Sequence, residues 1–150
     1  MRKVILVVIM LSSLVVSTTA QQVKWKFSSV KQTNGKYLLS VTGKISPEWH
    51  LYSMASPANG PTPMKIKFNN HPLIKIEGGI KEKGDMIRQY EEVFDMTVLY
   101  FEDSVEYTQL VRWTGSQLVK TNITGTIEYM LCTNSMCLPP TKEKFSIALQ

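Results

Sequence analysis

The sequence contains few of the residues that build disulfide scaffolds or metal centres. Among its 150 residues are only two cysteines and two histidines. Two cysteines cannot make a disulfide-rich scaffold, so the fold has to rest on an ordinary hydrophobic core. The histidines, His50 and His71, lie far from the cysteines along the chain, which leaves no compact set of metal ligands. We therefore expect neither a metal nor another cofactor.

Long apolar runs and clusters of like charge are also missing. After Val16 no apolar stretch approaches the roughly 20 residues that a membrane-spanning helix needs. The lysines are scattered, often at every second position, as in Lys24 and Lys26 or Lys65 and Lys67. In a strand this spacing places them on one solvated face. The formal net charge of +5 therefore indicates solubility, and we expect no nucleic-acid partner.

The first twenty residues have the layout of a secretory signal peptide. Arg2 and Lys3 precede an apolar stretch at residues 4–16, and small residues then run up to Ala20. The apolar stretch is too short for a typical membrane anchor, although a retained anchor is the alternative. The sequence predicts cleavage after Ala20, with residues 1–20 as the signal peptide.

The mature chain would then be a single domain of residues 21–150 in the periplasm or another exported compartment. Residue 21 is Gln and not Cys, so nothing indicates a lipid-anchored start. We expect no stable membrane insertion after cleavage. An exported chain reaches an oxidising compartment, where a disulfide can form and persist.

Alternating apolar and polar residues predict strands from one end of the mature chain to the other. Asn34-Gly35 is a strong hairpin signal. The polar stretch Lys81–Glu92, interrupted by Gly84-Asp85, is interpreted as a long connection. About seven to nine short strands without a long helical period favour an all-β, antiparallel sandwich. The predicted strand segments are "VKWKF", "YLLSV", "KIKF", "LIKIEGGI", "FDMTVLYFE", "VEYTQLVRW", "TGTIEYMLC" and "EKFSIAL".

Both cysteines lie in the stretch "YMLCTNSMCLPP", with four residues between Cys132 and Cys137. A purely structural disulfide here would close a small loop and contribute about 2 kcal/mol. A metal site could begin with the two thiolates, and the thioethers of Met130 and Met136 suit copper(I). A redox pair would need two neighbouring thiols in an accessible loop, where exchange proceeds through a mixed disulfide. The residues alone leave all three alternatives open.

Two stretches carry a resemblance to a known family. "WHLYS" at residues 49–53 and "IEYMLCTNSMCLPP" at residues 127–140 resemble the amino-terminal periplasmic domain of the thiol:disulfide interchange protein DsbD. The closest likeness is to its short stand-alone relatives, the disulfide-bond corrector domains, over nearly all of the mature chain. The resemblance implies an immunoglobulin-like antiparallel β-sandwich with a redox-active cysteine pair on a hairpin.

The resemblance also implies roles for individual residues near the pair. Cys137 matches the cysteine that exchanges with partners, and Cys132 matches its resolving mate. Tyr52 matches an aromatic residue beside the pair. His50 falls where the family can carry another aromatic, more usually a tyrosine.

The family shields its cysteines with a mobile cap loop that has acidic residues before an aromatic tip. "YEEVF" at residues 90–94 is the expected match, with Glu91 and Glu92 as the acidic residues. Phe94 is the expected shielding ring, and Val93 is the alternative tip residue.

The expected function is a relay of reducing equivalents, as a thiol–disulfide oxidoreductase or protein-disulfide reductase component. A membrane-embedded thiol electron donor would supply electrons, and thioredoxin-like periplasmic proteins, including those of cytochrome c maturation, would receive them. The chain departs from the family in having four residues between the cysteines instead of five, and neither a membrane domain nor a thioredoxin domain. The alternatives are a non-catalytic β-sandwich binding module with a structural disulfide, and a copper-handling protein.

Overall fold

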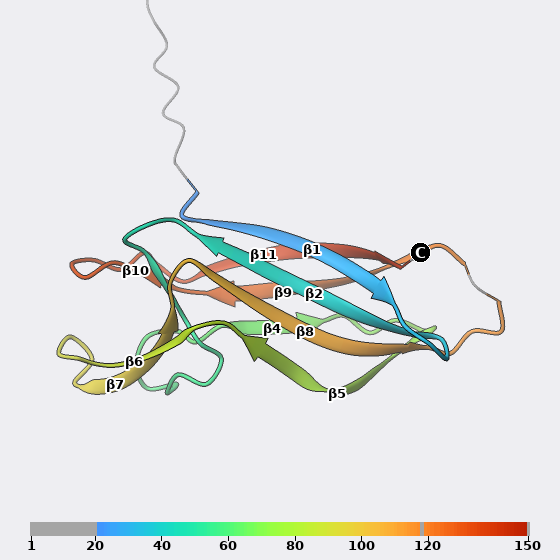
Figure 1. The fold of residues 1–150 in the computed structure, drawn as a ribbon, viewed down its shortest axis with the longest axis horizontal. Helices are drawn as coiled ribbons and strands as arrows, with labels where there is room; N and C mark the ends of the chain where they lie inside the picture. The colour runs from blue at the N-terminus through green and yellow to red at the C-terminus, as the bar shows by residue number, and fades with distance from the viewer. Residues whose placement is uncertain (1–20, 118, 150) are drawn as a thin grey trace, which may run out of the picture.

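The computed structural model describes residues 21–117 and 119–149, which form eleven strands and no helix (Figure 1). None of these residues therefore belongs to a helix that could cross a membrane. The predicted signal peptide lies outside the described residues. The strands are β1 Val23–Lys31, β2 Lys36–Ile45, β3 His50–Tyr52, β4 Lys65–Phe68, β5 Ile74–Lys83, β6 Met86–Glu91, β7 Met96–Phe101, β8 Ser104–Trp113, β9 Thr121–Tyr129, β10 Leu131–Cys132 and β11 Thr141–Leu149.

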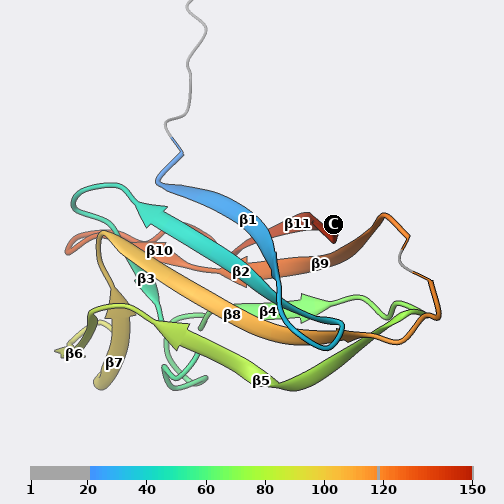
Figure 2. The same cartoon turned by 45° about the vertical axis from the view of Figure 1, so that its right-hand side comes forward.

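Two sheets form the layers of a sandwich (Figures 1 and 2). One layer has the strand order β1-β2-β8-β5, the other has the order β11-β9-β4, and every pairing is antiparallel. Aromatic pairs join the layers: the rings of Phe27 and Phe145 stack at 5.1 Å, and those of Trp25 and Tyr129 meet edge to face at 5.3 Å. The predicted antiparallel sandwich is confirmed.

Alternation along the strands places one set of side chains between the layers. On β2 the buried positions are Tyr37, Leu39 and Val41, and the residues between them are only partly buried. Ile123 and Ile127 on β9 face them from the second layer within the same hydrophobic cluster. This is the period of two that a strand with one buried face requires. The core therefore forms from many β-branched and aromatic side chains, as the small number of cysteines led us to expect.

A third sheet, β10-β3-β7-β6, lies at one end of the sandwich (Figure 2). Its strands continue from both layers: β3 follows β2, β7 leads into β8, and β10 follows β9 after a break at Met130. Leu131 and Cys132 are both buried because they face opposite sides of the third sheet, each covered by a different cluster, and Met130 separates them from β9. The unbroken strand up to Cys132 that the sequence predicted is therefore wrong in this detail.

The hairpin predicted at Asn34-Gly35 is confirmed. Both residues have positive φ angles, 58° and 69°, as a two-residue hairpin turn of the primed type requires.

The interpretation of Lys81–Glu92 as a long connection is wrong. Lys81–Lys83 end β5, and Met86–Glu91 form all of β6, so only Gly84 and Asp85 connect the two strands. β6 is an edge strand that pairs only with β7, and its side chains are mostly exposed. An exposed edge strand needs no apolar alternation, because its partner strand supplies the hydrogen bonds.

Candidate functional site

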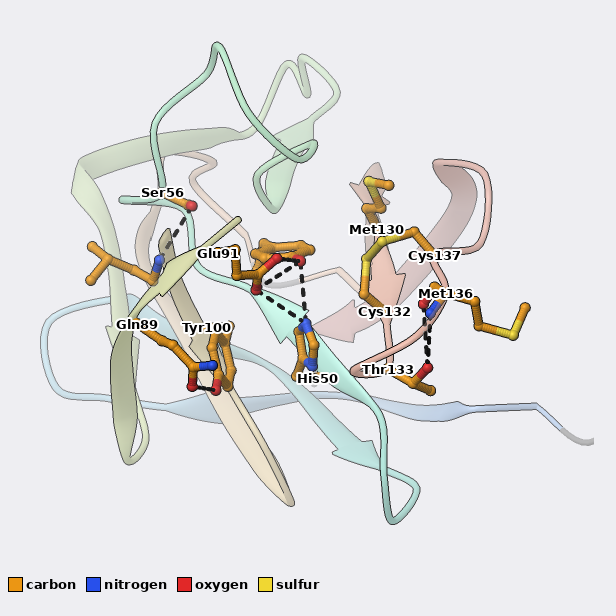
Figure 3. A network of polar contacts seen from close by, with 12 residues as sticks. His50, Ser56, Gln89, Glu91, Tyr100, Met130, Cys132, Thr133, Met136 and Cys137 are labelled. Atoms are coloured by element: carbon orange, nitrogen blue, oxygen red, sulfur yellow. Dashed lines mark hydrogen bonds and ion pairs between the residues drawn. A yellow bond between two sulfur atoms is a disulfide. The ribbon is translucent and has the colours of Figure 1, made fainter. Parts of the chain in front are cut away.

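The two cysteines are joined in a disulfide at the tip of the third sheet (Figure 3). Their Cα atoms lie 4.1 Å apart, and they flank a tight turn of Thr133–Met136. The backbone N–H of Thr133 donates to the carbonyl oxygen of Met136 at 2.8 Å, which closes the turn. The N–H of Leu138 donates to the carbonyl oxygen of Leu131 at 2.9 Å. The predicted tight connection between the cysteines is confirmed.

The two sulfur-bearing residues differ greatly in exposure. Cys132 is only 1% exposed, whereas Cys137 belongs to the exposed residues. Pro139 and Pro140 follow Cys137, and β11 begins only at Thr141. Because proline has no N–H to donate, this segment stays out of the sheet. A partner can therefore approach Cys137 from solvent but not Cys132.

A small aromatic cluster buries Cys132. The outward face of the third sheet brings Tyr52, Val98 and Tyr100 together with Cys132, apart from the main core. Successive strand residues point to opposite faces, so Leu51, Phe101 and Leu131 turn instead toward the main core. Partly buried side chains complete the cluster, namely Ile87, Phe94, Met96 and Met130.

A polar network lies within this aromatic cluster (Figure 3). The hydroxyl of Tyr52 donates to the carboxylate of Glu91, with distances of 3.0 and 3.2 Å to its two oxygens. Nε2 of His50 lies 3.2 Å from the Tyr52 hydroxyl and 3.6 Å from Oε1 of Glu91. His50 is only 5% exposed, and Tyr52 is fully buried.

Burial governs the ionisation of this network. Desolvation lowers the pKa of His50 below 6.5, so the imidazole is neutral at pH 7. Desolvation, with the nearby Glu91 carboxylate as a second cause, raises the pKa of Tyr52 far above its usual value. Burial likewise raises the pKa of Tyr100, whose ring centroid lies 4.4 Å from that of His50. The imidazole of His50 and the two tyrosine hydroxyls are therefore uncharged at neutral pH.

The β6–β7 hairpin places the expected cap residues. Glu91 ends β6, and a turn runs through Glu92 and Val93 to Asp95. Phe94 is partly buried against the cluster, and its ring meets that of Tyr52 edge to face at 6.3 Å. Val93 is 87% exposed and Glu92 is also exposed. Of the two expected tip residues, Phe94 is the one that lies against the cluster that contains Cys132.

Sequence reasoning did not single out three further neighbours of Cys132, which are Met96, Val98 and Tyr100. Alternation places all three on one face of β7. Only the pairing of Tyr100 with Tyr52 shows that this face is the one shared with Cys132. The alternation along β7 could therefore be seen in the sequence, but which residues its face contacts depended on the pairing with β3.

Glu82 on β5 was also missed. Its carboxylate accepts hydrogen bonds from the Ser53 hydroxyl at 2.6 Å and from the Met54 N–H at 3.0 Å. These bonds hold the chain where it leaves β3. The loop that follows reaches back over the site, because the N–H of Thr62 donates to the sulfur of Met130 at 3.4 Å.

The family model described as the N-terminal region of the thiol:disulfide interchange protein DsbD matches residues 16–149. The chain belongs to the DsbD N-terminal domain family. The resemblance seen in the sequence is thereby confirmed, and the chain is related to proteins of thiol:disulfide interchange.

Solved structures of DsbD N-terminal domains and a relative share this fold. The reduced N-terminal domain of DsbD from Neisseria meningitidis matches with a TM-score of 0.52 and 15% identity, over 73% of this chain and 75% of that one. The N-terminal periplasmic domain of ScsB from Proteus mirabilis matches with a TM-score of 0.54 and 15% identity, over 85% of this chain and 44% of that one. No curated protein sequence matches the chain.

A third similar structure is the complex of the DsbD N-terminal and PilB N-terminal domains from Neisseria meningitidis. Its TM-score is 0.52 at 11% identity, over 83% of this chain and 80% of that one. At these identities the likeness shows the fold alone. The fold of the DsbD N-terminal-like chain is thus an immunoglobulin-like β-sandwich, as expected.

Proposed function

We propose that this domain is an exported thiol–disulfide exchange protein that relays reducing equivalents through Cys132 and Cys137. The observation that carries the proposal is the unequal burial of the two ends of one disulfide, with Cys137 exposed and Cys132 only 1% exposed. A relay needs one sulfur that partners can attack and a second, neighbouring sulfur that resolves the mixed disulfide. A purely structural bridge needs no such difference.

In this proposal Cys137 exchanges with partners and Cys132 resolves the mixed disulfide. A partner thiolate attacks the sulfur of Cys137, and Cys132 leaves as the thiolate. In the opposite direction Cys132 attacks Cys137 and releases the partner. Phe94 and Tyr52 cover the inner sulfur, and Glu91 ties the cap hairpin to Tyr52 through its hydrogen bond.

The proposed partners are thioredoxin-like periplasmic proteins, with a separate membrane-embedded thiol protein as electron donor. Family membership supports this class of partner. The complex of a related DsbD N-terminal domain with a PilB N-terminal domain supports it further. Cytochrome c maturation proteins are one proposed destination of the electrons. We propose residues 21–150 as the single mature domain, with removal of residues 1–20.

Trapping in cells tests the proposal. Cys132→Ser should accumulate mixed disulfides on Cys137, because no second thiol resolves them. Cys137→Ser should accumulate few, because Cys132 is buried. Proteins isolated after acid quenching are compared on non-reducing gels, with the Cys132→Ser, Cys137→Ser double variant as the control. Equal trapping by the two single variants would overturn the roles, and no trapping by either would overturn the relay.

The reduction potential of the pair separates a relay from a structural bridge. A structural disulfide of an exported protein lies below about −300 mV, and a working relay should be less reducing than that. The potential is measured by equilibrating the domain with a dithiol buffer and counting free thiols. A value below that limit would favour the non-catalytic binding module.

A further inference from the structure

The register of the third sheet places His50 directly opposite Cys132. The two residues are Cα partners in the antiparallel pair of β3 and β10. Opposite residues of such a pair point to the same face, with Cβ atoms about 4.5–5.5 Å apart. His50 and Cys132 are therefore buried neighbours on the same face of the third sheet (Figure 3).

The hydrogen-bond network assigns the tautomer of His50. The hydroxyl of Tyr52 has one proton, which it donates to Glu91. Its oxygen can therefore only accept from Nε2 of His50, 3.2 Å away. Nε2 then carries the ring proton, and Nδ1 is the unprotonated nitrogen. Nδ1 is also the ring nitrogen nearer the backbone of β3, the strand that pairs with the strand of Cys132.

The surroundings of His50 suit a group that takes up a proton. Four side chains surround the His50 ring, which are Tyr52 from β3, Tyr100 from β7, Glu91 from β6 and Cys132 from β10. Glu102, the residue after β7, is a further charged group near Tyr100. Both tyrosines stay neutral at pH 7, because burial raises their pKa values. Glu91, 3.6 Å from Nε2, can stabilise the imidazolium once it forms.

We propose that His50 is the general base for Cys132. The inference rests on the proposed relay and concerns its resolving step. Nδ1 takes the proton from the Cys132 thiol as that sulfur attacks Cys137 in the mixed disulfide. The Cys132–Cys137 bond forms, the bond from Cys137 to the partner breaks, and the electron pair leaves on the partner sulfur as a thiolate. Over the whole exchange the domain loses two electrons and the partner gains them. The imidazolium then returns its proton to solvent.

The reverse direction uses the same groups. When a partner thiolate attacks Cys137, Cys132 leaves as a thiolate, and His50 gives it a proton that the ring takes up from solvent. Tyr52 and Glu91 act as positioning residues in both directions, because they hold the ring through Nε2. This arrangement is specific to a chain with histidine at position 50.

Ring closure can be measured without any protein partner. Cys137 of the reduced domain is converted to a mixed disulfide with thiopyridine, using dithiodipyridine as the probe. Attack by Cys132 then releases thiopyridone, which is followed by absorbance. A Cys132→Ser variant checks that this release requires Cys132.

The pH dependence of this release is the deciding readout. With a neutral imidazole as base, the wild-type rate should be level between the pKa of His50 and that of the thiol. In His50→Gln the rate should instead rise steadily with pH up to the ordinary thiol pKa of about 8.5. At pH 7 it should be about tenfold below wild type, because an unassisted thiol is only a few per cent ionised there.

Two variants make the comparison specific. His50→Tyr keeps an aromatic ring but supplies no base near pH 7, so it should behave like His50→Gln. His71→Gln is the matched control, because the chain has only this one other histidine, and His71 binds Thr121 at 3.0 Å from Nε2. Its release should follow the wild-type profile.

The wild-type profile decides the question even if a His50 variant does not fold. The lower break in the rate should coincide with the His50 titration, measured by proton NMR on the oxidised domain. A steady rise with no level region would overturn the inference, as would a His50→Gln profile identical to wild type. Neither result changes the outcome of the trapping experiment. If trapping fails but the release rate still has a level region, the relay is overturned while His50 still acts as the base for Cys132. The two proposals can therefore fail separately.

Discussion

At the tip of the β6–β7 hairpin, Val93 and Phe94 point in different directions. Val93 is 87% exposed, whereas the ring of Phe94 packs against the cluster around Cys132. A side chain that covers a thiol limits its access to reagents, and access is one determinant of thiol reactivity. The difference between two adjacent residues gives a matched pair for mutation.

We predict that Phe94→Ala speeds alkylation of the reduced thiols several-fold with little change in fold. The reason is that loss of the ring opens the cluster that buries Cys132. Alkylation is followed with iodoacetamide by mass spectrometry, which reports each cysteine separately. Val93→Ala is the control and should leave the rate unchanged. A rate that responds to Val93 and not to Phe94 would reverse the assignment of the cap.

His50 should make the stability of the oxidised domain depend on pH. Burial lowers its pKa in the folded state below 6.5, so the unfolded chain binds more protons as the pH falls. Stability is therefore complete above pH 6.5 and is lost as the pH drops toward the folded pKa. We expect the difference in unfolding free energy between wild type and His50→Gln to shrink or reverse over this interval. Urea titrations at several pH values measure it, and a difference that does not change with pH would contradict this prediction.

At the scale of an element, the turn of Thr133–Met136 is held by its own hydrogen bonds as well as by the disulfide. The N–H groups of Ser135 and Met136 donate to the hydroxyl of Thr133, in addition to the backbone bond that closes the turn. The neighbouring Leu138 also pairs with Leu131. The turn thus has local support that does not depend on the sulfur–sulfur bond.

Reducing the disulfide should cost no more than about 2 kcal/mol and leave the domain folded, because the bridge closes a loop of only six residues. The unfolding free energy is measured by urea denaturation with and without reductant. A double Cys→Ser variant without reductant should give the same value as the reduced domain. Loss of the cooperative transition on reduction would favour a structural bridge.

At the scale of the whole molecule, stability comes from the space between the two layers. Ile127 on β9 is fully buried in the main cluster, together with residues of β2 and β8. Ile76 on β5 is 41% exposed. Removing buried methyl groups loses their transfer free energy and leaves a cavity, whereas an exposed side chain has little of either to lose.

We predict that Ile127→Ala costs about 2–5 kcal/mol of unfolding free energy. The exposed Ile76→Ala should cost about 1 kcal/mol or less. Both are measured by urea denaturation of the oxidised domain. Similar losses for the two variants would mean that the two layers do not provide most of the stability.

Much of the fold could be predicted from local sequence. The alternation in β2 and the Asn34-Gly35 turn each identify a strand or hairpin from a few neighbouring residues. The edge strand β6 could not be found in this way, because a strand exposed on most of its surface carries no apolar period. Its existence depends on hydrogen bonds to β7, which no pattern within β6 records.

The sequence by itself determined that the chain is all β, that its cysteines flank a tight turn, and that the surrounding motif is that of the DsbD N-terminal family. These properties depend on residues that are close together along the chain. The tertiary structure alone decided that His50 lies directly opposite Cys132, and that Val98 and Tyr100 join the cluster that buries Cys132. Those properties depend on strand register and on packing between residues some 80 positions apart, because a shift of one residue would turn His50 to the other face of the sheet.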